Sequence, residues 1–210
     1  MDLELSDLQQ QRLRKAEELR SLGLDPYTPR SSRTHTTAAA LSRFAELEEN
    51  PGHGIEDPDS ITVAGRVVGV RHMGKSVFAH IRDGHGQLQI YLRKDDVGDE
   101  AFERFLKLID LNDFVEATGT LFRTRTGEIS LRVRDFRILT KALNPPPEKW
   151  HGLQDVEIRF RQRYADLIAN ADVRRIFEIR ARAIVIAIQG RGDMKIRGPS
   201  ILLALRALRS

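Results

Sequence analysis

Apolar and polar residues follow two different periods along this chain, and the change comes near Ser60. Before it, apolar residues recur at helical spacing in two segments, 7–22 and 38–49, each rich in charged residues. After it, apolar and β-branched residues alternate with polar ones, which is the period of a strand. The sequence therefore predicts two short helices, then one further helix at 99–109 among strands at 60–71, 76–82, 87–93, 114–124 and 128–139.

The predicted helices have narrow apolar faces. In the first, the apolar positions among many charges are Leu8, Leu19 and Leu22, and Gly23 ends the helix. Such helices need a partner surface to be stable. The helix at 99–109 is better supported, because four apolar residues share one of its faces: Phe102, Phe105, Leu106 and Ile109.

Three strands, a helix and two more strands form the order of an OB barrel. Gly65 and Gly69 suit the bends that close a small barrel. The expected fold is mainly β with flanking helices: a five-stranded OB-fold Greek-key barrel with N-terminal helices and a C-terminal helical linker. The stiff stretch 144–147, Asn-Pro-Pro-Pro, marks a boundary. The expected domains are an N-terminal helical extension at 1–58, the barrel at 59–143, and a Pro-rich linker with helices at 154–169 and 172–189 in 144–210.

Composition narrows the function classes. The 210 residues include no cysteine, which excludes disulfides, thiolate metal sites and a cysteine nucleophile. The start has no apolar segment typical of a signal peptide, and the longest apolar run is too short to span a bilayer, so we expect a cytoplasmic protein without membrane contact. Residues 151–210 hold 12 Lys and Arg against 6 Asp and Glu. This basic excess fits either an RNA-facing surface or a solvated helix face.

Phe78 is the first candidate for a binding role. It alternates with Ser76 and His80, whereas Val77, Ala79 and Ile81 form the opposite, apolar side of the strand. A large aromatic ring on a polar face suits base stacking by a single-stranded RNA reader. A ring packed under a loop or helix would explain the same pattern.

Three polar residues could read a base edge beside this ring. Gln89 shares the polar side of its strand, Arg71 ends the first strand, and Glu128 begins the fifth. Uracil offers an N–H donor between two carbonyl acceptors, so a carboxylate suits the donor, and Arg and Gln suit the acceptors. Each of the three could equally be an ordinary surface residue.

Catalytic chemistry has no comparable signal. The six histidines lack metal-ligand spacing, and the adjacent acidic pairs would point apart on a regular element. No nucleophile and base occur together. The sequence predicts no catalytic residue and no metal site.

Several stretches together resemble the class II lysyl-tRNA synthetases of bacterial type. They span about residues 11–187 in the order expected of that family: RLRKAEELRSLGLDPY, RTHT, VAGRVVGVRHMGKSVFAHIRD, GQLQIYLRKDDVG, GTLFRTRTGEISL and PPPEKWHGLQDVEIRFRQRYADLI.

The resemblance implies that the barrel binds the uridine-rich anticodon of tRNA(Lys). Phe78 would stack on the central uridine, and Arg71, Gln89 and Glu128 would contact its edges. His80 would add a second stacking surface. The C-terminal helices would connect to a class II catalytic domain and contribute to a homodimer.

One stretch departs from the family pattern. Class II motif 1 is expected at Arg191–Pro199, but Asp193 replaces an apolar residue, and Lys195 and Arg197 replace acidic ones. Motifs 2 and 3, which hold ATP and the adenylate, do not follow. We therefore expect a chain that is inactive alone, with ATP and Mg²⁺ used only together with a catalytic domain. A frame change or truncation after about Ala187, or divergence as a paralogue, would explain the departure. Two alternatives stay open: an active ligase completed by another chain, and a general single-stranded nucleic-acid-binding module.

Overall fold

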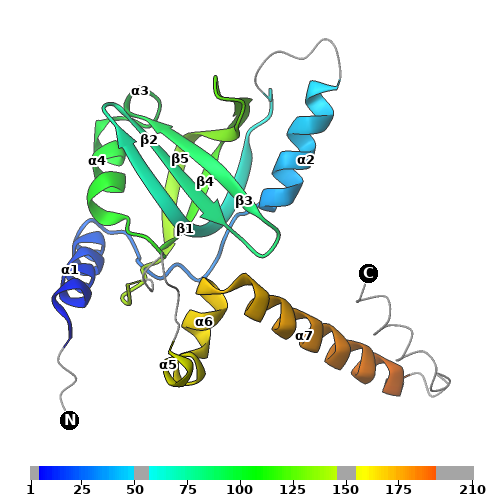
Figure 1. Ribbon diagram of the computed structural model, residues 1–210. Coiled ribbons are helices and arrows are strands. Elements are labelled where there is room, and N and C mark those ends of the chain that lie inside the picture. The colour runs from blue at the N-terminus through cyan, green and yellow to red at the C-terminus, as the bar shows by residue number, and fades with distance from the viewer. Residues whose placement is uncertain (1–4, 50–56, 146–154, 193–210) are drawn as a thin grey trace. The chain divides into compact units, whose positions relative to one another are not determined.

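The structure is a computed structural model that describes residues 5–49, 57–145 and 155–192. It divides the chain into two compact units, Met1–Pro145 and Pro146–Ser210. The first unit contains a barrel with helices around it (Figure 1).

Five strands close into the barrel, in the order β1-β2-β3-β5-β4 and back to β1. All neighbours are antiparallel except β3 and β5, which run parallel. This arrangement confirms the predicted mainly β, five-stranded OB-fold barrel with helices at both ends. The strands are β1 (Ile61–Met73), β2 (Ser76–Arg82), β3 (Gln87–Arg93), β4 (Phe114–Arg123) and β5 (Ile129–Thr140).

Closure of the barrel depends on local irregularities in the ladder. β1 shifts register against β2 between Val67 and Gly69, whereas Gly65 keeps a regular pairing with β4. The β4–β5 ladder shifts register twice, between Phe114 and Val115 and between Thr118 and Gly119. A Cβ at Gly119 would lie 1.9 Å from the carbonyl oxygen of Arg132, so only glycine lets β4 pass this close to β5.

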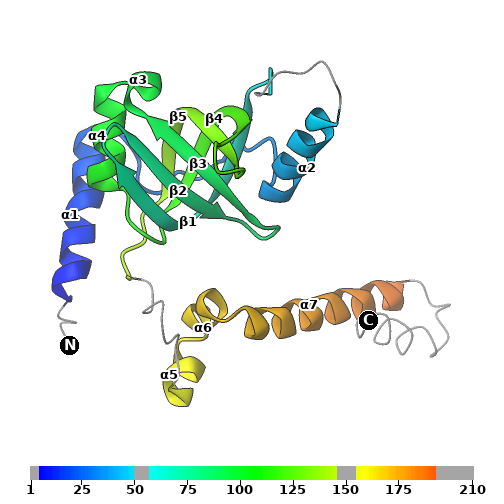
Figure 2. The same ribbon diagram turned by 45° about the horizontal axis from the view of Figure 1, so that its top comes forward.

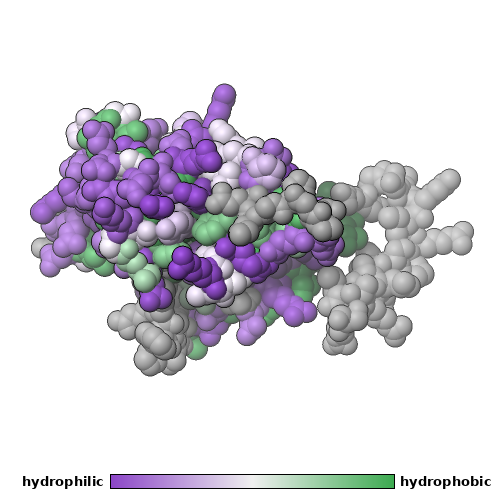
Figure 3. Space-filling model, turned by 90° about the horizontal axis from the view of Figure 1, so that it is seen from above, coloured by the Kyte–Doolittle hydropathy of each residue, from purple (hydrophilic) through white to green (hydrophobic). Residues whose placement is uncertain are grey.

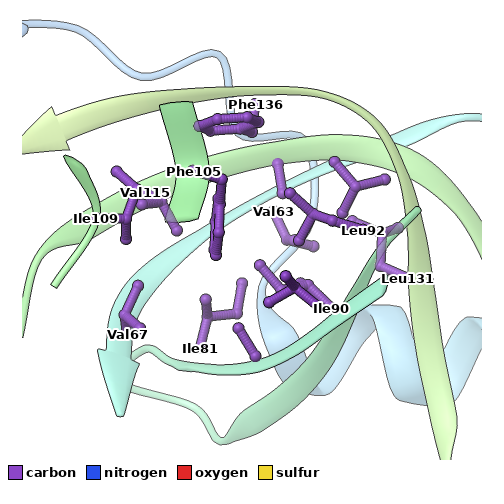
Figure 4. Close-up of a cluster of buried hydrophobic side chains, with 14 of the residues drawn as sticks. Val63, Val67, Ile81, Ile90, Leu92, Phe105, Ile109, Val115, Leu131 and Phe136 are labelled. Atoms are coloured by element: carbon purple, nitrogen blue, oxygen red, sulfur yellow. The ribbon is translucent and has the colours of Figure 1, made fainter. Parts of the chain in front are cut away.

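The inward-facing side chains and the helix between β3 and β4 form one core. After a short helix α3 (Lys94–Val97), α4 (Asp99–Leu108) buries Phe102 and Phe105. The rings of Phe105 and of Phe136 from β5 are nearly perpendicular, with centroids 5.1 Å apart and an interplanar angle of 81° (Figure 4). Leu106 of the predicted apolar face is only half-buried. Because the core collects the apolar side chains, the visible surface is mostly hydrophilic (Figure 3).

Two N-terminal helices pack on this barrel, and α2 and α4 lie on opposite sides of it (Figures 1 and 2). In α1 (Asp7–Ser21) Leu19 is buried, whereas Leu8 and the C-cap residue Leu22 are 46% and 57% exposed. The helix also buries Ala16 and Arg12, whose guanidinium donates to the Ala142 carbonyl at 2.8 Å. α2 (Thr37–Glu48) buries two apolar residues in the core: Ala40 and Phe44.

The second unit contains α5 (Val156–Arg161), α6 (Arg163–Ala169) and α7 (Ala171–Gly192). The single helix predicted at 154–169 is wrong, because the backbone leaves helical geometry at Gln162, with φ −114° and ψ 55°. The break is stabilised by buried Asp166, whose carboxylate accepts hydrogen bonds from three side chains: Arg159, Arg163 and Asn170.

Some predicted features lie outside the described residues. They are the prolines at 146 and 147, the HGLQ stretch at 151–154, and the motif 1 stretch from Asp193 onward. Within the described ranges, no helix combines the length and the apolar character needed to cross a membrane.

Candidate nucleic-acid interface

The outer face of β1, β2 and β3 brings four of the five predicted site residues to neighbouring positions. Arg71 of β1 lies opposite Phe78 of β2. Two residues further along β2, His80 lies opposite Gln89 of β3. Glu128 directly precedes β5, which pairs with β3, and its carboxylate reaches His80 and Gln89. Residues separated by up to 57 positions in sequence therefore share one surface.

Aromatic rings follow one another across this face. The rings of Phe78 and Tyr91 lie 4.8 Å apart at 34°, and those of Tyr91 and Phe122 lie 5.7 Å apart at 54°. All three residues are half-buried, and the Tyr91 hydroxyl lies 3.1 Å from Ser76 Oγ. The face thus offers a larger aromatic surface than one ring, which suits stacking of more than one base.

The sequence interpretation did not assign Tyr91 or Phe122 to the site. The signal for Tyr91 was present, because it alternates with Gln89 and must share its side of β3. Phe122 has a weaker signal, since its place beside Tyr91 depends on how β3, β5 and β4 close the barrel.

A hydrogen-bonded network holds the polar residues. Gln89 Nε2 donates to one oxygen of Glu128 at 2.7 Å, and His80 Nε2 lies 3.0 Å from the other. On its far side, Gln89 Oε1 accepts a hydrogen bond from Ser130 Oγ at 2.7 Å. Gln89 is only 8% exposed, so it is a fixed, largely buried group and not an ordinary surface residue.

The network leaves some hydrogen-bonding groups of these side chains available to a ligand. The Glu128 side chain is 47% exposed, and a carboxylate has about four lone-pair positions, of which two are occupied here. Gln89 Nε2 also lies 3.5 Å from His80 Nε2, and Gln89 Oε1 retains one lone pair. Arg71 is exposed beside Phe78. The arrangement therefore combines an acceptor, a fixed amide and a cation next to an aromatic surface.

Two arginines near the face are paired with acidic residues. Arg132 Nε donates to Asp96 at 2.8 Å, and this bond holds the pKa of Asp96 below its ordinary value. Arg93 pairs with Asp95 at 2.8 Å. In the part of the chain that the structure describes, no group of three or more His, Asp or Glu could hold a metal ion.

Comparison with known proteins agrees with this geometry. Residues 61–139 match the family of OB-fold nucleic acid binding domains. The chain is 49% identical over 203 residues to a lysine–tRNA ligase of Roseiflexus sp. strain RS-1, and 51% identical over 201 residues to one of Chloroflexus aurantiacus. The chain is a homologue of lysine–tRNA ligases. This confirms the resemblance to lysyl-tRNA synthetases that the motifs indicate.

These matches cover nearly all of this chain but less than half of each relative. They include 95% and 94% of this chain but 40% of each of these two lysine–tRNA ligases. A third ligase, from Pelotomaculum thermopropionicum, is 44% identical over 199 residues, which are 93% of this chain and 37% of that protein. The chain thus spans about two fifths of the length of the curated relatives it matches.

Proposed function

We propose that the barrel binds the anticodon of tRNA(Lys). In this proposal Phe78 stacks on the central uridine, Arg71, Gln89 and Glu128 contact its edges, and His80 adds a stacking surface. The observation that carries the proposal is the bonded set of Glu128, Gln89 and His80 beside the Phe78–Tyr91 ring pair, on the outer face of an OB barrel.

The chemistry of the face favours uridine over cytidine. Uracil presents its N3–H to an acceptor such as Glu128, and its carbonyl oxygens to donors such as Arg71 and Gln89. Cytosine has a lone pair at N3, which would face the carboxylate and repel it. Because Gln89 is already fixed by Ser130, little conformational entropy is lost when it contacts a base.

The test compares two RNAs on the purified 210-residue chain. Affinity is measured for tRNA(Lys) and for the same tRNA with its central anticodon uridine changed to cytidine. The proposal expects the variant to bind more weakly by roughly 1–3 kcal/mol, the value of a good base-edge contact. Equal affinities would show that the face does not read this base.

A general single-stranded binder is the second candidate, favoured by the aromatic surface of Phe78, Tyr91 and Phe122. Such a surface stacks any base, because every base has a π face. Short oligonucleotides of uridine, cytidine and adenosine would separate the two candidates. A uridine preference supports anticodon reading, whereas equal binding of the three supports the general binder.

We propose that the ligation reaction depends on the part of the lysine–tRNA ligases that this chain does not match. In this proposal ATP and Mg²⁺ are used only together with that part, in the cytoplasm, and the 210-residue chain acts by binding. ATP–pyrophosphate exchange with lysine tests this. Exchange by the purified chain would overturn it, and exchange only after adding a second chain would indicate a ligase completed in trans.

Homodimerisation through the second unit is a further part of the proposal. It is supported by apolar residues that α7 leaves exposed: Ile176, Ile184, Val185, Ile186 and Ile188. Light scattering of the chain at several concentrations tests it. A constant monomer mass would contradict the dimer.

A further inference from the structure

The last residue of α2 is bound to the end of β4. Arg123 Nε donates to Glu48 Oε1 at 2.6 Å, and Arg123 Nη2 donates to Glu48 Oε2, so the contact is a two-pronged ion pair. The hydrogen bonds from Arg123 hold the pKa of Glu48 below its ordinary value. Arg123 has a second partner, because its Nη1 donates to the carbonyl of Gly127. One guanidinium therefore connects α2 to the β4–β5 turn.

The β4–β5 turn in turn fixes the backbone of Glu128. Thr124 N donates to the Glu128 carbonyl at 2.9 Å, and Glu128 N donates to Thr124 Oγ1 at 3.0 Å. Gly127 has φ +89°, a left-handed conformation that favours glycine. Because Arg123 holds the Gly127 carbonyl, the position of the Arg123 guanidinium affects where the backbone of Glu128 lies.

α2 is also anchored at its other end, so it can serve as a fixed support. Thr37 Oγ1 and Thr37 N donate to the two oxygens of Asp83 at 2.6 and 2.9 Å. Between the ends, Phe44 is 2% exposed in the barrel core. Glu48 therefore extends from a helix that is held at its start and along its buried face.

We propose that Glu48 is a positioning residue for base recognition: through Arg123 it holds the β4–β5 turn in the place where Glu128 meets Gln89 and the base. The inference rests on the proposed anticodon binding and adds the N-terminal helix α2 to it. Glu48 does not touch RNA in this proposal. It acts on specificity by fixing the residue that does.

A purely electrostatic role of Glu48 and a positioning role predict different effects on RNA binding, which makes the inference testable. If Glu48 mattered only as a negative charge near RNA, removing that charge would strengthen binding of every RNA by similar factors. If Glu48 positions Glu128, removing the charge lowers the preference for uridine. Glu49 is the matched control, because it is the exposed acidic neighbour at the end of the same helix.

The experiment measures the ratio of dissociation constants for cytidine-substituted tRNA(Lys) and native tRNA(Lys). Glu48→Gln should lower this ratio by about 3- to 10-fold, part of the roughly 5- to 150-fold that one polar base contact provides. Glu49→Gln should leave the ratio unchanged. Equal ratios for Glu48→Gln and Glu49→Gln would overturn the inference.

Two further variants separate failure of the inference from other failures. Arg123→Lys keeps the charge but lacks the planar fork that reaches both Glu48 and Gly127, so it should lower the ratio as Glu48→Gln does. An unchanged ratio in Arg123→Lys would also count against the positioning of Glu128 through Arg123. If Phe78→Ala left tRNA affinity unchanged, the proposed function itself would fail. If Phe78→Ala weakened binding while Glu48→Gln and Arg123→Lys both kept the wild-type ratio, the positioning inference alone would be wrong.

Discussion

The two faces of β2 differ in what their side chains do. On the inner face Val77, Ala79 and Ile81 are fully buried. On the outer face Phe78 and His80 are half-buried, and their neighbours across the ladder carry rings and hydrogen-bonding groups. One alternating strand thus supplies buried core residues from one side and, in the proposed function, RNA contacts from the other. Substitutions on the two faces should therefore affect different measurements.

The end of the barrel is an exception to the apolar interior. Lys141 is fully buried, and its Nζ lies 2.6 Å from Asp110 Oδ2, from Asp113 Oδ2 and from the Leu108 carbonyl. Lys15 of α1 contacts the other oxygen of Asp110 at 2.7 Å. Buried polar groups at this end of the barrel therefore link the residue that follows β5 to the N-terminal helix, whereas the polar groups on the outer face are the ones proposed to contact RNA.

The largest expected effect concerns stability. Phe105→Ala removes a ring that is 1% exposed and packed on Phe136, so it should cost about 3–5 kcal/mol of unfolding free energy. Urea unfolding measures this cost. Where the variant remains folded, its affinity for tRNA(Lys) should match the wild type. A cost below about 1 kcal/mol would contradict the assignment of Phe105 to the core.

The next effect concerns binding on the outer face. Phe78→Ala should weaken tRNA(Lys) binding by roughly 1–3 kcal/mol, because it removes the stacking ring. Titration with labelled tRNA measures the loss. Phe114→Ala is the matched control: Phe114 is also half-buried, but on β4, where it lies under Arg66 at 4.4 Å. If both variants lost equal affinity, stacking on Phe78 would not be the cause.

Glu128→Gln tests specificity at nearly constant shape. An amide can turn its NH₂ group toward the lone pair of cytosine, so the preference for uridine should fall by about 1–2 kcal/mol. Competition between native and cytidine-substituted tRNA(Lys) measures it. Asp135→Asn, at an exposed acid on β5, should retain the preference. An unchanged preference in Glu128→Gln would remove Glu128 from the set of base readers.

The smallest effect is pH-dependent. Burial raises the pKa of Asp110, but hydrogen bonds from Lys141 and Lys15 outweigh it and leave the pKa below its ordinary value. A carboxyl with a lowered folded pKa adds stability above its unfolded pKa of about 3.9, and this stability is lost as pH falls through the folded value. Asp110→Asn should therefore cost about 1 kcal/mol at neutral pH, and this cost should fall as the pH drops below the unfolded pKa of about 3.9. Urea unfolding at neutral and at acid pH measures it, and a pH-independent cost would contradict the role.

The sequence predicts the barrel well because the signals are local. Alternation places each strand within about two residues, and it separates the inner from the outer side of β2 and β3. It also identifies Phe78 as an outer-face ring. The polar face and the strand ends single out Arg71, Gln89 and Glu128, the resemblance adds His80, and the structure brings these residues together.

Other features depend on contacts between distant segments. The burial of Gln89 follows from the parallel pairing of β3 with β5, which places Ser130 beside it. The exposure of Leu8 follows from how little of α1 packs on the barrel. The contact of Arg123 with Glu48 joins residues 75 positions apart. No local pattern carries such information.

The most direct test of anticodon reading combines Phe78→Ala with the uridine-to-cytidine change in the anticodon. Affinities of wild type and variant for both tRNAs form a double-mutant cycle. If Phe78 stacks on this uridine, the base change should cost the variant less than it costs the wild type, with a coupling of about 0.5–3 kcal/mol. Strictly additive costs would contradict direct contact between Phe78 and the central uridine.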